Sequence, residues 1–275
     1  MIGVDKKVEI TTVGDVVCAN GSIVSQVINM NVYSFAVDGI LIDTGAQSLL
    51  NEFKPFLQTA DFDKVVFTHI HEDHTGCASW IEENRKVPQY IHPISVKNCA
   101  DPEDYPQYRH IVWGDRAPFH ALPLGKTFES RTTTWDVIET PGHATDHLAF
   151  YNRKTKTLFS GDLFVKNTTK VVLRDESIPQ IIRSIQRVLT YDFNDVFCCH
   201  AGYLANGREL FQDKLEILKN LVSEVTSLYM SGLTAEEIKD KLFPKKYPIT
   251  QFSDGEWDSL HIVTSIIAEY EPVKK

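Results

Sequence analysis

A dense group of potential metal ligands lies between residues 68 and 74, which read Thr-His-Ile-His-Glu-Asp-His. The donors are the imidazoles of His69, His71 and His74 and the carboxylate of Asp73. Imidazole nitrogen together with carboxylate oxygen suits zinc, iron or manganese better than calcium or magnesium, which prefer oxygen ligands. The segment therefore indicates a metal site, and the alternative interpretation is a histidine-rich surface turn.

An apolar run directly before these donors, Asp63–Phe67, predicts a short buried strand. Alternate side chains of a strand point to the same side, so His69 and His71 can face one point. The turn that follows can direct Asp73 and His74 toward a neighbouring point. This geometry predicts two adjacent metal ions at the end of a strand.

Three further donors follow strand-like runs downstream. His143 comes after Thr134–Glu139, where Pro and Gly end the run. Asp162 follows a short apolar run that breaks at a glycine, and His200 follows a third apolar run. Taken singly, such residues are more often turn or helix-capping residues than ligands. Because each closes a strand-like run, neighbouring strands would bring them to one edge of a sheet.

The order of these motifs is His-x-His-x-Asp-His, then Pro-Gly-His, then Ser-Gly-Asp, then a histidine that ends a strand. This order resembles the metallo-β-lactamase superfamily over roughly residues 7–205. The resemblance implies an α/β protein, an αββα four-layer sandwich, with the metals at the edge where its two sheets meet. It also implies a ligand set: His69, His71 and His143 for the first metal, Asp73, His74 and His200 for the second, and Asp162 bridging both.

Residues beside the ligands are expected to support them. Asp43 matches the family's aspartate that orients a ligating imidazole through its other ring nitrogen, and it also serves the turn after a strand at Gly39–Ile42. His147 occupies a place where relatives often carry a second histidine, and we expect it to support the site rather than to ligate. Cys199, beside His200, is expected to point away, since neighbours in a strand alternate sides.

A metal pair defines the expected mechanism. Two adjacent cations lower the pKa of a shared water to roughly 7, so a metal-bridging hydroxide is the expected nucleophile. One metal would polarise a carbonyl or phosphoryl oxygen, and the other would stabilise the departing anion. Asp73 is the expected catalytic residue, because it can orient the hydroxide while ligating. Zinc is the expected metal, with iron or manganese as alternatives.

Asp162 narrows the reaction class. True β-lactamases of the family commonly place cysteine there, whereas aspartate is similar to glyoxalase II, lactonases and phosphodiesterases. We therefore interpret the sequence as a dinuclear metal-dependent hydrolase of a small ester, thioester or lactone. The alternative within hydrolysis is a phosphodiesterase or ribonuclease.

Two alternatives lie outside hydrolysis. One is a redox relative, either a diiron flavoprotein partner or a mononuclear iron dioxygenase, and the intact His71, Asp73 and His74 argue against both. The other is a binding or regulatory protein that retains an inherited metal site.

The composition limits the kinds of molecule that the chain is expected to bind. The chain has 275 residues and a formal net charge of −9. Nucleic acid binding needs clustered Lys and Arg, so a small-molecule substrate is expected instead. No apolar stretch follows basic residues at the N-terminus and no run is long enough to span a bilayer, so we expect a cytoplasmic protein without membrane association.

One long stretch, residues 100–119, lacks clear periodicity and is rich in Pro, Asp, Tyr and His. We expect a loop here that covers part of the substrate cleft, and the alternative is an ordinary surface excursion.

The chain after residue 207 has helical patterns. Apolar spacing predicts a helix over about Arg208–Tyr229, and a capping box at Thr234 predicts a short helix through Leu242. A last helix is expected from about Gly255 to Tyr270. We therefore divide the chain into a metallo-β-lactamase-like catalytic domain, residues 1–207, and a helical C-terminal extension, residues 208–275. We expect the extension to pack on the catalytic domain or on a second subunit of a homodimer.

Overall fold

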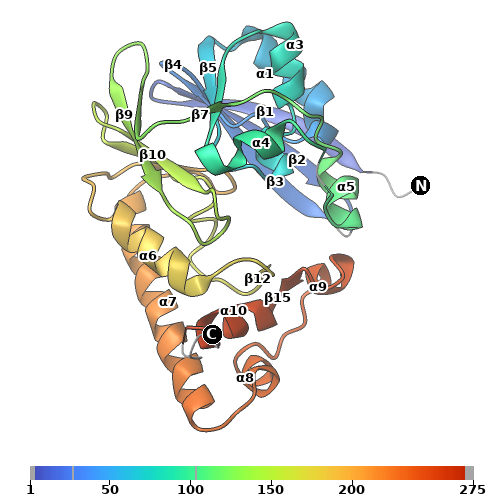
Figure 1. Cartoon of the computed structure of the whole chain (residues 1–275), viewed down its shortest axis with the longest axis vertical. Coiled ribbons are helices and arrows are strands. Elements are labelled where there is room, and N and C mark those ends of the chain that lie inside the picture. Colours follow the sequence, from blue (N-terminus) through green and yellow to red (C-terminus); the bar gives the residue numbers. More distant parts are fainter. Residues whose placement is uncertain (1–3, 27, 103, 270–275) are drawn as a thin grey trace.

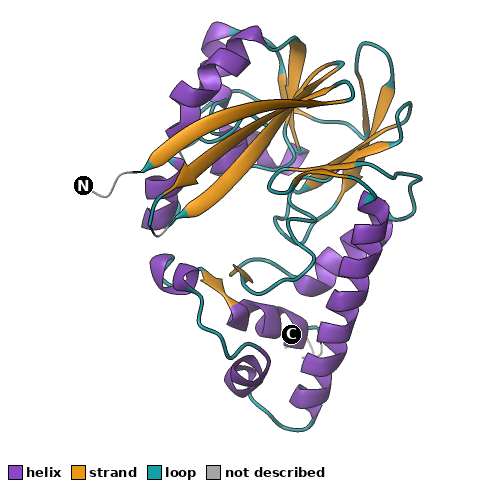
Figure 2. Cartoon of the chain, turned by 180° about the vertical axis from the view of Figure 1, so that it is seen from behind, coloured by secondary structure: helices purple, strands orange, loops and turns teal. Residues whose placement is uncertain are grey.

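The computed structural model describes residues 4–26, 28–102 and 104–269. Two large sheets face each other at one end of the molecule, and the last helices lie beyond them (Figure 1, Figure 2). The seven strands of the first sheet follow the order of the sequence: β1 (Asp5–Val13), β2 (Val16–Val24), β3 (Asn29–Val37), β4 (Gly39–Ile42), β5 (Phe62–Val66), β6 (Gln89–Ile91) and β7 (Leu122–Pro123). Strands β4 to β7 are parallel, so the ends of β4 and β5 meet at one edge.

The second sheet has six strands, and its sequence order is rearranged. From edge to edge it contains β14 (Gly202–Leu204), β13 (Val196–Cys198), β11 (Thr157–Phe159), β10 (Leu148–Asn152), β9 (Thr134–Glu139) and β8 (Thr127–Glu129). Strands β11 and β13 run parallel, so the residues that follow them leave the sheet at the same end.

Helices pack on the outer face of each sheet, and short helices also occur in the connecting segments. The helices that precede the second sheet in the sequence are η1 (Gln47–Leu49), α1 (Leu50–Thr59), α2 (Glu72–Thr75), α3 (Ala78–Asn84), η2 (Pro93–Ser95), α4 (Val96–Cys99) and α5 (Gln107–Trp113). The later helices are α6 (Ile178–Val188), α7 (Gly207–Met230), α8 (Ala235–Leu242), α9 (Pro248–Phe252) and α10 (Ser259–Ile267).

Three apolar cores separate the layers. Between the sheets, the ring of Phe159 packs on Phe35 and Phe197, with centroids 5.6 and 4.9 Å apart. Outside the first sheet, the core includes side chains of α1, α3 and α5. Outside the second, it includes side chains of α6, α7, α8 and α10. The predicted αββα sandwich with C-terminal helices is confirmed.

The C-terminal helices match the sequence pattern in part. Helix α7 lies within one residue of the predicted bounds, and both hydrogen bonds of the predicted capping box at Thr234 open α8. These helices share the core of the second sheet with α6, while the domain boundary at residue 207 stays a prediction. In the described part of the chain, no helix combines the length and apolar character needed to cross a bilayer.

Two predicted elements were wrong in detail. The last helix begins at Ser259 rather than at Gly255, because Trp257–Asp258 form strand β15 and pair with β12 (Val172–Leu173). Its expected end at Tyr270 lies outside the described residues. The expected loop at residues 100–119 contains a helix, α5, whose Tyr108, Val112 and Trp113 are buried.

Candidate metal centre

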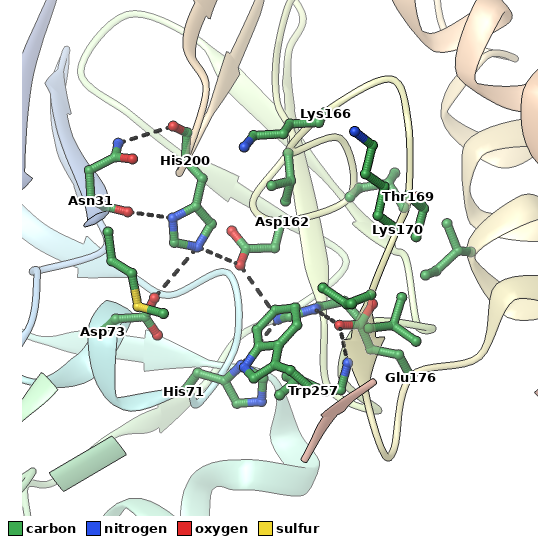
Figure 3. Close-up of a pocket in the computed structure, with 18 of the residues that line it drawn as sticks. Asn31, His71, Asp73, Asp162, Lys166, Thr169, Lys170, Glu176, His200 and Trp257 are labelled. Atoms are coloured by element: carbon green, nitrogen blue, oxygen red, sulfur yellow. Dashed lines mark hydrogen bonds and ion pairs between the residues drawn. The ribbon is translucent and has the colours of Figure 1, made fainter. Parts of the chain in front are cut away.

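The candidate ligands lie where strands end, and both sheets contribute. The segment after β5 provides four of them, and the turns after β9, β11 and β13 provide His143, Asp162 and His200. Figure 3 shows His71, Asp73, Asp162 and His200 converging on one pocket. The structure thus brings together all seven predicted ligands, and their role as ligands stays a prediction.

The segment after β5 differs from the sequence-based picture. Strand β5 ends at Val66, so strand alternation was the wrong reason for expecting His69 and His71 to face one point. They nevertheless meet, with ring centroids 4.4 Å apart. His71 directly precedes α2, and this single helical turn carries Asp73 and His74.

Glycines shape the turns that present two of the three candidate ligands from the second sheet, His143 and Asp162. Gly142 has a φ of 137°, and a Cβ there would lie 2.6 Å from the backbone nitrogen of Ile181. Gly161 has a φ of 51°, and a Cβ there would lie 2.5 Å from Nε2 of His147. Both positions therefore need a residue without a side chain. This requirement explains the glycines of the Pro-Gly-His and Ser-Gly-Asp motifs.

The donors form two triads around one carboxylate. The ligand atoms of His69, His71 and His143 lie within 4.8 Å of one another, as do those of Asp73, His74 and His200. Oδ2 of Asp162 lies between them, 2.9 Å from Nε2 of His200 and 3.5 Å from Nε2 of both His74 and His143. Each triad has the number and kind of donors that hold a divalent cation. A carboxylate between the two triads is placed to reach both cations.

Among the described residues, three buried donor atoms at the centre have no hydrogen-bond partner: Nε2 of His69, Nε2 of His74 and Oδ1 of Asp162. Buried polar atoms are nearly always paired, since an unpaired one costs about 1–3 kcal/mol. Bound cations would satisfy all three atoms. The residues present therefore fit a metal centre with nitrogen and oxygen ligands.

The outward nitrogens of the imidazoles are fixed by a surrounding layer. Nδ1 of His200 donates to the backbone oxygen of Asn31 at 2.5 Å, and the amide of Asn31 donates back to the oxygen of His200 at 3.0 Å. Nδ1 of His143 lies 3.3 Å from Oε1 of Glu176. Such partners hold a ligating ring in one orientation. Glu176 was missed at the sequence level, because it reads as an ordinary charged turn residue.

Asp43 accepts several hydrogen bonds within this layer. It is fully buried and accepts bonds from the backbone nitrogen and hydroxyl of Thr68, both at 2.8 Å, and from Nδ1 of His74 at 2.8 Å. The thiol of Cys199 adds a fourth contact at 3.1 Å. Cys199 therefore does not point away as expected, but toward the carboxylate beneath the site. Asp43 orients His74 and leaves its Nε2 for a metal.

His147 uses both ring nitrogens within the protein. Nδ1 lies 2.8 Å from the hydroxyl of Thr140, and Nε2 accepts the backbone N–H of Asp162 at 2.9 Å. Burial, with the nearby His143, lowers the pKa of His147 to about 3, so the ring is neutral and can accept. As expected, it supports the site, here by holding the backbone of the central carboxylate.

The charges at the centre are matched to cation binding. Burial lowers the pKa of His200, but the carboxylates of Asp162 and Asp73 outweigh it and raise the pKa to about 9. Burial likewise raises the pKa of Asp73, but His74 and His200 hold it below its usual value. Cations that bind here would displace imidazole protons, so metal affinity should rise with pH.

A pocket of about 500 Å³ opens onto the metal centre. Tyr108, Arg109 and Trp113 of the segment at residues 100–119 line it, which supports the expectation that this segment covers part of the cleft. From the C-terminal region, Tyr247 and Trp257 line it as well. Sequence analysis also missed three basic residues of the lining, Lys166, Lys170 and Lys214.

Arg109 connects three segments around the pocket. It makes two hydrogen bonds to the buried Glu72 of α2, at 2.6 and 2.7 Å, and one to Glu256 at 3.3 Å. Close by, the indole N–H of Trp257 donates to the hydroxyl of Tyr108 at 2.9 Å. The helix that carries Asp73 is thereby tied to the C-terminal region.

Comparison with known proteins agrees with this architecture. The family model described as metallo-beta-lactamase superfamily matches residues 30–200. The chain is 22% identical over 234 residues to the probable metallo-hydrolase YqjP of Bacillus subtilis, covering 70% of each protein. It is 27% identical over 170 residues to the hydroxyacylglutathione hydrolase of Serratia proteamaculans, covering 60% of this chain and 57% of that protein. A solved metallo-beta-lactamase family protein of Thermus thermophilus superposes with a TM-score of 0.67 at 20% identity, covering 93% of this chain and 94% of that one.

Proposed function

From the premise that the chain belongs to the metallo-β-lactamase superfamily and is a metal-dependent hydrolase, we propose that it cleaves a small ester, thioester or lactone at a centre of two divalent cations. One observation carries the proposal. Two donor triads flank Asp162 beside one pocket, and three buried donor atoms, on His69, His74 and Asp162, have no hydrogen-bond partner among the described residues. A single cation would leave one of the two triads unused.

The donor set favours particular metals. Five imidazoles and two carboxylates suit zinc, and they also suit iron or manganese. When bound, two such cations supply an activated water near neutral pH and polarise a carbonyl oxygen. Zinc is our first proposal for the native metal.

The chain's own residues would prepare this chemistry. The carboxylate of Asp73 lines the pocket beside Nε2 of His74, at 3.4 Å, and Nε2 of His200, at 3.5 Å. From there it can accept a hydrogen bond from the attacking water and orient it toward the substrate. Asp43 and His147 hold His74 and Asp162 fixed, so little reorganisation is needed during the reaction.

The pocket favours a small substrate. Its volume is about 500 Å³, which is within the range of small-molecule sites. Besides the polar groups of the metal centre, its walls include apolar side chains such as Trp113, Val172 and Trp257. The Serratia relative is named a hydroxyacylglutathione hydrolase, which is a name for a hydrolase of an acylated small molecule. We therefore propose a small-molecule acyl substrate rather than nucleic acid.

Metal analysis and a substrate panel test the proposal. The full chain, purified without added metal and then loaded with zinc, is expected to bind about two equivalents. It should hydrolyse thioesters, lactones or aryl esters faster than bis-p-nitrophenyl phosphate. Preference for the phosphodiester would replace our substrate class with the alternative one. A single bound iron with oxygen consumption would refute the hydrolase proposal.

A further inference from the structure

Three lysines line the pocket without a carboxylate partner, and we refer to them together as the lysine wall. Lys166 and Lys170 are exposed residues between β11 and β12, and Lys214 is a buried residue of α7 that is only 5% exposed. Within the described part of the chain, none of these three ammonium groups forms an ion pair. In Figure 3, Lys166 and Lys170 lie on the opposite side of Asp162 from His71.

The acidic groups of the pocket are already engaged. Asp162 and Asp73 face the imidazoles of the metal centre, and Glu176 lies 3.3 Å from His143. The fourth cation of the lining, Arg109, is paired with Glu72. The lysine wall therefore carries uncompensated positive charge, although the chain as a whole has a net charge of −9.

Lys214 also holds an unusual turn next to the centre. Its ammonium donates to the backbone oxygen of Phe164, which accepts the N–H of Lys166 at 2.6 Å as well. This closes a three-residue turn around Val165, whose φ is 51°. A β-branched residue rarely adopts such a left-handed conformation, and strained turns of this kind cluster at functional sites.

An ammonium group has three donors, and the carbonyl of Phe164 accepts only one of them. Burying a charged group without a counter-ion is unfavourable, whereas burying it beside an opposite charge is far less so. Lys214 lines the pocket, so a ligand there can provide the missing negative charge. The two exposed lysines would attract the same ligand from solvent.

We propose that Lys214, Lys166 and Lys170 form an anion subsite that binds an acidic substituent of the substrate, a carboxylate or a phosphate group separate from the bond that is cleaved. The inference rests on the proposed function, because it places this substituent in the same pocket as the reacting acyl group. Lys214 contacts the anion at the buried end of the wall. Lys166 and Lys170 contact it at the exposed end.

Binding of simple anions tests the subsite directly. The zinc-loaded full chain would be titrated calorimetrically with succinate and with inorganic phosphate. Lys214→Met removes the charge but keeps an unbranched stem, and we expect it to weaken binding of at least one anion roughly 10- to 100-fold. Lys214→Arg should retain most of the affinity. Lys219→Met, an exposed position on the same helix outside the pocket, serves as the matched control and should bind as the wild type does.

The two anions separate the possible substituents. Tighter binding of succinate indicates a carboxylate, tighter binding of phosphate indicates a phosphate group, and similar binding of both indicates recognition by charge alone. Any of these results supports the subsite if Lys214→Met weakens the binding. Unchanged affinity of Lys214→Met for both anions overturns it.

A second variant tests the subsite even if Lys214→Met does not fold. Lys166 and Lys170 are exposed, so the double change to alanine should leave the cores intact while it weakens anion binding several-fold. If Lys214→Met does not fold, unchanged affinity of the double variant overturns the subsite.

Kinetics distinguish failure of the subsite from failure of the proposed function. The wild type should prefer an aryl hemisuccinate over the matched neutral butyrate ester, and Lys214→Met should reduce this ratio of kcat/KM values roughly 10-fold or more. If lysine-dependent anion binding occurs but no ester, thioester or lactone is cleaved, the proposed function fails and the subsite stands. If both esters are cleaved with a ratio that no lysine alters, the subsite fails and the function stands.

Discussion

The two walls of the pocket are built differently. On the metal wall, formed by the seven candidate ligands, five donors are buried and His71 and His200 are half-buried. A second layer fixes the orientation of several of them, as Asp43 does for His74 and Asn31 does for His200. On the lysine wall, the segment from Val165 to Lys170 alternates between half-buried and exposed residues, and its ammonium groups lack acidic partners. The difference suggests that the reaction requires fixed geometry, whereas substrate recognition depends on charges that a ligand completes.

The largest expected effect lies on the metal wall. Asp162→Ala or His71→Ala should lower kcat/KM by more than about a thousandfold, because each change removes a proposed ligand from the proposed metal centre, which would stabilise the transition state by several kcal/mol. Steady-state kinetics on the best substrate of the panel measures this loss. Asp192→Ala, an exposed acidic control, should have no effect. Normal turnover by either ligand variant with an intact circular dichroism spectrum would contradict the assignment.

Removing the metals should destabilise the protein, and the metal wall should lose more protection than the lysine wall. At a free zinc concentration about a thousand times the Kd, binding stabilises the folded state by about 4 kcal/mol, so chelation should lower Tm by about 8–16 °C. Scanning calorimetry of chelated and reloaded protein measures the shift. Hydrogen exchange should increase at Thr68–Thr75 more than at Val165–Lys170. Equal loss of protection on both walls would remove the distinction between them.

Weakening the second layer should have a smaller effect. Asp43 has a φ of 56°, a conformation that asparagine also tolerates, so Asp43→Asn should keep the turn. The change removes the negative charge and replaces one acceptor oxygen by an NH2 donor, so the carboxylate's hydrogen bonds to Thr68 and His74 cannot all be kept. We expect metal affinity to fall about 10- to 100-fold. Competition with a chelator measures it, with Asp61→Asn on the surface as control. Unaltered affinity would show that the imidazole is held by other contacts.

The smallest predicted effect concerns the C-terminal side of the pocket. Trp257→Phe removes the 2.9 Å hydrogen bond to the hydroxyl of Tyr108 and should lower the free energy of unfolding by about 1 kcal/mol. Tyr108→Phe removes the same bond from the other partner. Denaturant unfolding of both variants and of the double variant should show strongly non-additive losses. Additive losses would mean that the two side chains stabilise the protein independently.

Sequence reasoning located the metal wall because its signals are local. Short apolar runs that stop at Pro, Gly or Asp predict strand ends, and parallel strands bring such ends together. His143, Asp162 and His200 could be found in this way, whereas Asp43 was identified through the family resemblance. The same local reasoning gave the wrong explanation for the proximity of His69 and His71. It assumed that the strand continues to these residues, whereas β5 ends at Val66.

The lysine wall could not be found in this way. Lys214 lies in an amphipathic helical pattern, where a lysine normally reaches solvent, and only tertiary packing of α7 buries it. Glu72, inside the ligand motif, is buried for a similar reason, since its partner Arg109 is 37 residues away. The pairing of β15 with β12 likewise depends on residues far apart in the sequence.

The origin of the donors has a consequence for biosynthesis. Residues 69–74 follow a strand of the first sheet, whereas His143, Asp162 and His200 all follow strands of the second. Each triad thus takes two members from one half of the sandwich and one from the other. A nascent chain cannot complete the second triad until His200 has left the ribosome and the halves have docked. We therefore expect ion capture to be a late, post-docking event in maturation.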